Sequence, residues 1–184
     1  MFDKTKKLLD DRACDRALLK ISEGNPEALS VIYRLYGRMI LSVAFQVLKN
    51  YHDAEDALQD VLLSVAQNAD KYKTGTNARA WVMAITRNLS LNALKAKKDN
   101  ISYDLLDNNQ AVSDDSASGS FQSVIIDDAL HTLSEDEQMI VKLKLYTGLS
   151  HTEIASVMNI SRACAEKRYE RAIKKLREYF MKGQ

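Results

Sequence analysis

Residues 133–170 read LSEDEQMIVKLKLYTGLSHTEIASVMNISRACAEKRYE, and this stretch predicts three helices joined by two short turns. A Ser-x-x-Glu pattern, the spacing of a capping box, marks two helix starts, at 134–137 and at 150–153. Gly148 and Asn159 suit the left-handed backbone that ends a helix. Helices with such short connections are expected to pack closely against one another.

The second and third of these helices fit a helix-turn-helix over residues 150–170. The two helices of this motif cross closely, which the small Ala155 and the apolar Ile160 and Ala165 around the turn allow. The motif presents the start of its last helix to the major groove of DNA, where cations reach phosphates and polar side chains reach base edges. The candidate DNA-binding residues here are Ser161, Arg162, Cys164, Glu166, Lys167, Arg168 and Arg171.

Two of these residues leave a choice open. Glu166 either accepts a hydrogen bond from a cytosine in the groove or pairs with neighbours such as Arg162 on the helix surface. Cys164 is either a small, partly buried thiol or a redox-sensitive one.

The charges of the chain are unevenly distributed. Its 184 residues carry a formal net charge of only +1, which by itself does not indicate a nucleic-acid partner. However, residues 78–98 contain five basic residues and no acid, whereas residues 99–128 contain seven aspartates and no base. Residues 107–123 are rich in Asp, Asn, Ser and Gly and show no helical or alternating period. This composition predicts a flexible acidic linker.

The segment before the linker predicts several helices. Asn25 and Pro26 suit the cap and the first position of a helix, and Asn77 is a plausible cap for the basic helix that contains Trp81. Between them, a helix that opens at Asp53 would bury alanines and valines and expose acidic side chains. An exposed acidic ridge should face solvent or a partner.

The expected fold class is all-α. Two small helical domains, 1–98 and 129–184, are joined by the flexible acidic linker 99–128, and the C-terminal domain is the helix-turn-helix. No uncharged apolar run approaches the roughly 20 residues of a membrane span. The N-terminus also lacks the apolar core and cleavage site of a signal peptide. We therefore expect a cytoplasmic protein without direct membrane insertion.

The motifs of common enzymes are missing from the sequence. It contains no GxxxxGK phosphate loop and no HExxH metal motif, and its three histidines lie far apart. Cys14 and Cys164 indicate neither a disulfide framework nor a metal cluster. We therefore expect no enzyme, no cofactor and no metal site.

The chain resembles the sigma-70 family in its short extracytoplasmic-function (ECF) form, and the likeness covers both domains. The stretch YHDAEDALQDVLLSVAQNADKY (51–72) is similar to the family's segment that docks on the clamp coiled coil of the polymerase β′ subunit. TNARAWVMAITRNLSLNALKAKK (76–98) is similar to the segment that reads and melts the minus-ten promoter element. Residues 133–161 and 168–180 resemble the family's reader of the minus-thirty-five element.

This resemblance implies a sigma factor that binds core RNA polymerase, through its β′ clamp and β subunits, and directs it to promoter DNA. It also implies regulation by an anti-sigma factor. The polymerase contacts that it implies are Asp53, Glu55, Asp56, Gln59 and Asp60. The minus-ten contacts that it implies are Lys71, Lys73, Thr74, Asn77, Arg79, Trp81, Arg87, Asn88 and Lys95.

Other interpretations of these residues stay open. The acidic residues also fit solvated helix charges, and the loop residues an ordinary surface turn. Trp81 could stack on a base or belong to the core, and Arg87 with Asn88 could form a buried hydrogen-bond set. For the whole chain, the alternative is a stand-alone helix-turn-helix regulator with an N-terminal sensor or dimerisation domain. Residues 51–98 favour the sigma factor, because such a regulator has no need for an acidic ridge followed by this loop and basic helix.

Overall fold

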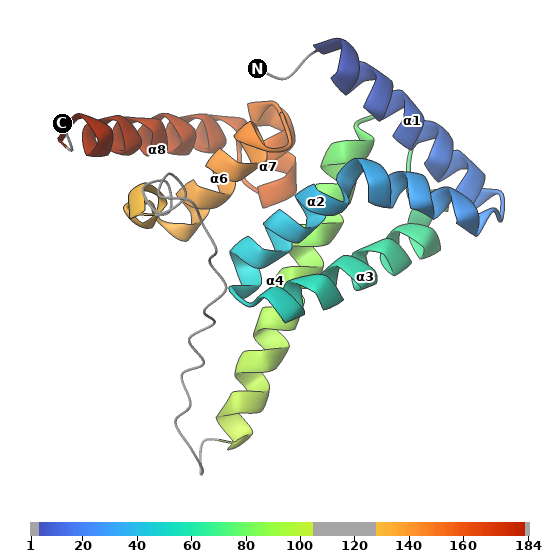
Figure 1. Cartoon of the computed structure of the whole chain (residues 1–184), viewed down its shortest axis with the longest axis horizontal. Coiled ribbons are helices and arrows are strands. Elements are labelled where there is room, and N and C mark those ends of the chain that lie inside the picture. The colour runs from blue at the N-terminus through green and yellow to red at the C-terminus, as the bar shows by residue number, and fades with distance from the viewer. Residues whose placement is uncertain (1–3, 105–127, 183–184) are drawn as a thin grey trace.

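The computed structural model describes residues 4–104 and 128–182, and every regular element in these ranges is helical (Figure 1). The N-terminal helices are α1 (Lys4–Ser22), α2 (Leu29–Leu48), α3 (Tyr51–Asn68) and α4 (Ala78–Asp104). The C-terminal helices are α6 (Glu135–Leu145), α7 (His151–Met158) and α8 (Arg162–Lys182). The all-α fold class expected from the sequence is confirmed.

Helix α2 lies at the centre of the N-terminal domain and contacts α1, α3 and α4. With the short 3-10 helix Pro26–Ala28 before it, it has the length and composition of a membrane-spanning helix, with a hydropathy of 1.3. Its apolar residues, however, pack inside the bundle, where Ile32, Tyr36 and Ile40 are fully buried. The apolar character of α2 is therefore that of a core helix.

The helix starts of the N-terminal domain follow from their capping residues. The Asn25 side chain accepts a hydrogen bond from the Glu27 amide, as the sequence predicts. Helix α3 begins at Tyr51 rather than at Asp53, because Asn50 caps it and accepts a bond from the Asp53 amide. The N-cap of α3 is therefore Asn50, three residues before Asp53, where the sequence predicted the start of the helix.

The C-terminal domain forms the helix-turn-helix that the sequence predicts. Both capping boxes are present, at the starts of α6 and α7. Asn159 ends α7 with φ of 53°, and Gly148 adopts φ of 66° in the turn before it. The turn between α7 and α8 is thus short, and α8 follows directly from Ser161.

Two elements differ from the sequence prediction. Helix α1 was not predicted, yet it buries Cys14, Leu18 and Ile21 in the core. Helix α4 continues to Asp104, six residues into the predicted linker 99–128. The rest of that linker, 105–127, lies outside the described residues.

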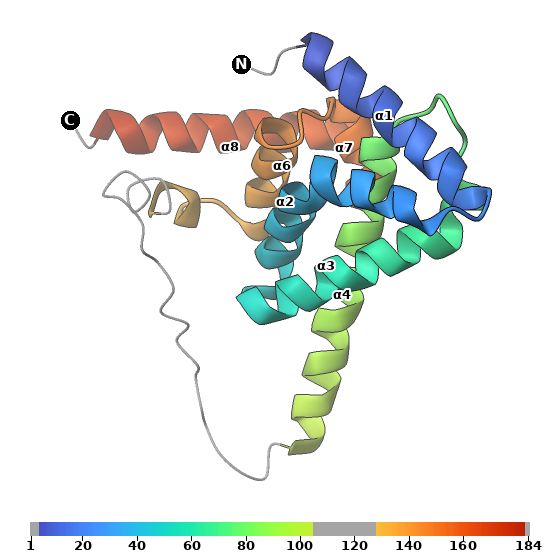
Figure 2. The same ribbon diagram turned by 45° about the vertical axis from the view of Figure 1, so that its right-hand side comes forward.

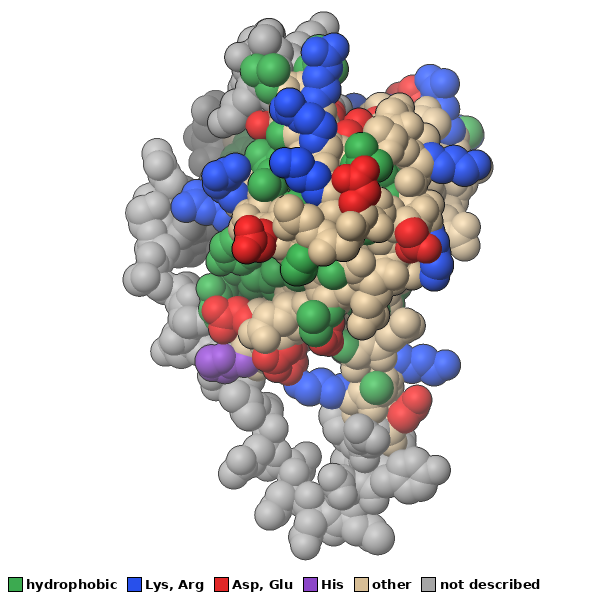
Figure 3. Space-filling view, turned by 90° about the vertical axis from the view of Figure 1, so that its right-hand side faces the viewer, with side chains coloured by type: hydrophobic (Ala, Val, Ile, Leu, Met, Phe, Trp, Pro, Cys, Tyr) green, Lys and Arg blue, Asp and Glu red, His purple; other side chains and the backbone are tan. Residues whose placement is uncertain are grey.

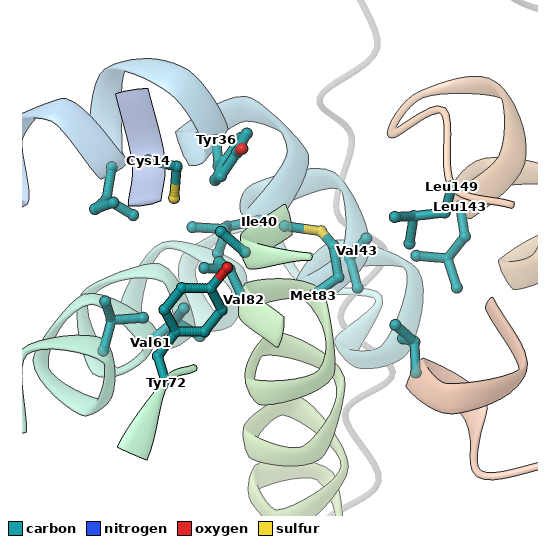
Figure 4. Close-up of a cluster of buried hydrophobic side chains, with 14 of the residues drawn as sticks. Cys14, Tyr36, Ile40, Val43, Val61, Tyr72, Val82, Met83, Leu143 and Leu149 are labelled. Atoms are coloured by element: carbon teal, nitrogen blue, oxygen red, sulfur yellow. The ribbon is translucent and has the colours of Figure 1, made fainter. Parts of the chain in front are cut away.

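The two domains pack against each other. Buried side chains of the N-terminal domain, including Val43 and Met83, belong to one cluster with Leu143 and Leu149 of the C-terminal domain (Figure 4). Figures 1 and 2 both place α7 beside the start of α4, and these two helices are in contact. The first residues of α4 therefore lie at an interface between the domains.

Candidate nucleic-acid and protein interfaces

A groove of about 440 Å³ lies between α3 and α4. Its acidic side chains, Asp53, Asp56 and Asp60, stand about one helical turn apart along α3. Apolar side chains from three helices also line it, Leu48, Ala57, Leu89 and Ala93 among them, and Lys97 lies at the groove beside Asp53. This acidic groove combines negative charge with apolar surface, which suits an amphipathic partner segment that carries basic residues.

Most of the residues expected to contact the polymerase lie on or beside the acidic groove. Three of the five are exposed: Asp56, Gln59 and Asp60. Asp53 is partly buried and forms an ion pair with Lys97 of α4, and Glu55 lies 3.8 Å from the Nδ1 atom of His52. Within the described part of the chain, no cation lies in salt-bridge range of Asp56 or Asp60. These two carboxylates are therefore the acids of the groove best placed for an external cation.

Tyr72 anchors the loop between α3 and α4. Its hydroxyl donates a 2.6 Å hydrogen bond to Asp15 of α1, and its ring centroid lies 5.4 Å from that of Trp81. Burial, together with the bond to Asp15, raises the pKa of Tyr72 above its ordinary value. Around this anchor, three residues expected at the minus-ten element are exposed: Lys71, Lys73 and Thr74. Trp81 itself is partly buried and packs against the core cluster, which favours its role in the core.

Asn77 caps α4, as the sequence predicts. Its Oδ1 atom accepts a hydrogen bond of 2.8 Å from the Ala80 amide. Its Nδ2 atom donates to the carboxylate of Glu153 in α7. The amide that was expected to face DNA is therefore bonded to the C-terminal domain.

Arg79 is 2% exposed, although the sequence led us to expect it at the DNA surface. Its Nη2 atom forms an ion pair of 2.9 Å with Asp11, and its Nη1 atom donates a 2.8 Å bond to the carbonyl oxygen of Thr147. The guanidinium also lies 5.5 Å from the ring centroid of Tyr36. In this arrangement Arg79 is therefore closed to an external ligand.

Three further residues expected at the minus-ten element lie on the later turns of α4. Asn88 and Lys95 are exposed, and Arg87 is partly buried. The exposure of Asn88 contradicts the alternative in which Arg87 and Asn88 form a buried hydrogen-bond set. These side chains stand apart from the loop that Tyr72 anchors.

Helix α8 presents most of its predicted DNA-binding residues to solvent. Four are exposed: Ser161, Arg162, Lys167 and Arg171. Cys164 is partly buried, and Ser161 accepts a 3.2 Å hydrogen bond from its amide. Arg168 forms an ion pair with Asp136 of α6, and this contact holds α8 against α6. Glu166 lies 3.9 Å from the Nδ1 atom of His151, not against Arg162 as the pairing alternative proposed.

Helix α1 carries a basic row that the sequence motifs did not reveal. Arg12, Arg16 and Lys20 recur once per turn and are exposed. Two aspartates of the same helix point inward, because Asp11 pairs with Arg79 and Asp15 with Tyr72. Lys and Arg side chains accordingly gather on the upper part of the face that α1 covers (Figure 3). The nearly neutral chain thus shows a locally positive surface.

The thiol of Cys14, on α1, is buried in the N-terminal domain beside Tyr36. Burial raises the pKa of Cys14 to about 12, and the neighbouring carboxylates add to this shift. The described residues contain no group of three His, Cys, Asp or Glu side chains that could hold a metal ion.

Comparison with known proteins identifies relatives for both domains. Residues 32–99 match the family model of Sigma-70 region 2, and residues 123–176 match that of Sigma-70, region 4. The RNA polymerase sigma factor CarQ of Myxococcus xanthus is 28% identical over 163 residues, which cover 86% of this chain and 92% of CarQ. The ECF RNA polymerase sigma factor SigW of Bacillus subtilis is 23% identical over 176 residues, covering 89% and 94% of the two chains.

Solved structures share the fold. CnrH, determined in complex with the cytosolic domain of CnrY, superposes with a TM-score of 0.66 at 18% identity, covering 94% of this chain and 99% of CnrH. The sigma factor RpoE of Bartonella quintana, determined with the anti-sigma factor NepR, gives a TM-score of 0.67 at 23% identity and covers 81% of this chain and 94% of RpoE. At these identities the likeness shows the fold alone.

Proposed function

Since this chain belongs to the sigma-70 family, in its extracytoplasmic-function group, and directs transcription initiation as a sigma factor, we propose how its surfaces divide that work. The N-terminal domain, 1–98, binds core RNA polymerase and the minus-ten element. The C-terminal domain, 129–184, binds the minus-thirty-five element. Residues between them, 99–128, connect the two DNA-reading domains.

The acidic groove is the proposed polymerase site. Asp56 and Asp60 are exposed one turn apart beside an apolar lining, so a basic amphipathic segment of the β′ clamp can pair with both carboxylates while its apolar side chains enter the groove. Asp53 contributes less directly, because Lys97 already offsets its charge. This combination of two unpaired acids with an apolar groove is the observation that carries the proposal.

The loop that Tyr72 anchors is the proposed minus-ten site. Its exposed Lys71, Lys73 and Thr74 offer cations and a hydroxyl to the phosphates and bases of an unstacked strand. The Tyr72–Trp81 contact and the bond to Asp15 hold this loop against α1 and α4. The basic row of α1 adds a sequence-independent attraction for DNA at the same end of the domain.

The minus-thirty-five element is read by the first turns of α8. Arg162, Lys167 and Arg171 are exposed there, where they can reach phosphates and base edges. Arg168 supports this surface indirectly, since its ion pair with Asp136 fixes α8 against α6. Glu166 remains available for a base contact, with His151 beside its carboxylate.

In this proposal the chain supplies recognition and strand opening, and the polymerase supplies the catalysis of RNA synthesis. The protein needs no cofactor for either task. It works in the cytoplasm, where the polymerase is. Binding energy gained from the separated strands offsets the unstacking and bending of the promoter.

Regulation by an anti-sigma factor belongs to the same proposal. One protein of the same fold, RpoE, was solved with such a factor bound. A partner that covers the acidic groove or holds the domains together would block access to polymerase or DNA. Affinity purification of the chain from its native cells should recover a stoichiometric inhibitor, and its absence under several growth conditions would count against this regulation.

Run-off transcription with bacterial core RNA polymerase on a pool of genomic promoter fragments tests the function. The wild-type protein should give discrete transcripts that are absent without it. An Asp56→Lys/Asp60→Lys variant should reduce them about tenfold or more, because like charges would face the basic partner. The control Glu23→Lys/Glu27→Lys adds the same charge at exposed positions outside the acidic groove and should transcribe normally. DNA binding without polymerase-dependent transcripts would instead indicate the stand-alone regulator.

A further inference from the structure

The imidazole of His151 lies between the two helices of the helix-turn-helix. His151 is the first residue of α7, and α7 packs against α8 (Figures 1 and 2). Its Nδ1 atom lies 3.9 Å from the Oε1 atom of Glu166 on α8. Glu166 is the one acid among the DNA-binding residues predicted on α8. The histidine therefore faces the side chain of that helix whose role in DNA reading is the least usual.

The ring of His151 is held in place by its surroundings. Its centroid lies 5.2 Å from that of Tyr169, which follows Glu166 by about one turn of α8. Tyr169 is itself partly buried against the hydrophobic core, and the His151 side chain is only 22% exposed. The Nδ1 edge of the imidazole therefore keeps a fixed direction toward Glu166.

The surroundings of the two ring nitrogens favour one tautomer of His151. The Nε2 atom is buried and has no hydrogen-bond partner among the described residues, so a proton there would be a buried donor without an acceptor. The lone pair of Nδ1 would then face the carboxylate of Glu166, which is also unfavourable. A proton on Nδ1 avoids both costs. The neutral ring is therefore expected to offer an Nδ1–H donor to Glu166.

Glu166 is free to use such a donor. Its side chain is 45% exposed, and within the described part of the chain no lysine or arginine lies in salt-bridge range of its carboxylate. A rotation of this exposed side chain closes the gap to Nδ1. A glutamate that contacts a base loses rotamer freedom and brings its charge near the phosphates of DNA. A donor that holds one carboxylate oxygen lowers both costs and leaves the other oxygen available.

Cytosine is the base that this carboxylate can read, because its N4 amino group is a donor in the major groove. We infer that His151 is a positioning residue for the minus-thirty-five contact. Its Nδ1–H group holds the Oε1 atom of Glu166, so that the Oε2 atom accepts a hydrogen bond from the amino group of a cytosine. The inference rests on the proposed function and assigns a base specificity within it.

Base preference in transcription tests this inference. The templates are variants of a promoter found by run-off transcription, in which each position of the minus-thirty-five element is changed in turn to the other three bases. With the wild-type chain and core polymerase, one position should favour cytosine, on one of the strands, by about tenfold. Glu166→Gln should lose this preference, because an amide side chain pairs with adenine instead. The preferences at the other positions should not change.

Two substitutions of similar shape isolate the donor of His151. His151→Asn keeps an N–H group close to the place of Nδ1, whereas His151→Leu fills the same space without a donor. His151→Leu should lower the cytosine preference to about twofold, and His151→Asn should keep at least about half of the wild-type value. Both lose the ring contact with Tyr169, so a merely structural role would change them equally. Thr152→Ala, at an exposed neighbouring position, should leave the preference unchanged.

The double variant Glu166→Gln/His151→Leu separates positioning from stability. Its base preferences should equal those of Glu166→Gln alone, because His151 acts only through Glu166. A cytosine preference that survives His151→Leu, equal losses in the His151→Asn and His151→Leu variants, or no cytosine preference in the wild type would overturn the inference and leave the proposed function intact. No polymerase-dependent transcript from the wild-type protein would overturn both.

A second measurement needs no variant to fold. In the wild-type protein, the nitrogen chemical shifts of the neutral His151 imidazole should show the proton on Nδ1. A neutral ring with its proton on Nε2 would overturn the inference, because His151 would then offer Glu166 no donor.

Discussion

Arg79 shows how a single residue depends on partners far away in the sequence. Its guanidinium pairs with Asp11, 68 residues before it, and donates a hydrogen bond to the carbonyl oxygen of Thr147, 68 residues after it. Asp11→Ala would leave a buried cation unpaired, so we expect the free energy of unfolding to fall by about 3 kcal/mol. Urea denaturation measures this loss. Asp10→Ala, on the same helix, should change stability by less than about 0.5 kcal/mol, and an equal loss in both variants would contradict the role of the ion pair.

The two cysteines should differ in reactivity. Burial raises the pKa of Cys14 to about 12, above the ordinary 9.0, so the folded protein holds almost no thiolate there near neutral pH. Cys164 is only partly buried. A thiol reagent at pH 8 should therefore label Cys164 in the folded protein and Cys14 only after denaturant is added. Rapid labelling of Cys14 in a Cys164→Ser variant would show that α1 detaches readily.

At the scale of elements, an ion pair fixes α6 to α8. The Nζ atom of Lys175 donates a 2.7 Å hydrogen bond to Glu137, which also accepts a bond from the Ser134 amide. Burial alone raises the pKa of Glu137, but these bonds outweigh it and hold the pKa below the ordinary 4.5. The ionised Glu137 therefore stabilises the fold above pH 4.5, and this contribution is lost as the pH falls through the lowered pKa.

Glu137→Gln tests that contribution. At pH 7 the variant should lose about 2 kcal/mol of unfolding free energy, because a charged hydrogen bond is removed. The difference from the wild type should shrink as the pH falls below 4.5. Urea denaturation across this pH range measures it, with the exposed Glu135→Gln as the matched control. A difference that stays constant with pH would show that the ion pair does not carry the effect.

Elements with local signals were predictable, and those held by distant contacts were not. Asn77, Ser134 and Ser150 cap helices through side chains within three residues, so the sequence alone marks these starts. Helix α1 was missed because its inward acids Asp11 and Asp15 interrupt the apolar pattern. The exposed acids of α3 were predictable from helical spacing, whereas the burial of Arg79 depends on packing between domains.

At the scale of the whole molecule, the shared hydrophobic cluster should make the two domains unfold together. Leu149 is fully buried in that cluster and lies near Val43 and Met83 (Figure 4). Truncating Leu149 to alanine should lower the free energy of unfolding by about 2–5 kcal/mol. It should also uncouple the unfolding of the C-terminal domain from that of the N-terminal domain. Leu149→Ala is therefore expected to unfold in two steps, where the wild type unfolds in one.

Two probes can separate these steps. Trp81 is the one tryptophan in the chain, so its fluorescence reports on the N-terminal domain, while far-ultraviolet circular dichroism reports on helices of both. Their melting curves should coincide in the wild type and diverge in Leu149→Ala. Leu133→Ala truncates a leucine in a cluster confined to the C-terminal domain, so its two curves should shift but stay together. Curves that already diverge in the wild type would mean that the domains separate before either unfolds, because the interface would then be weaker than each domain's own core.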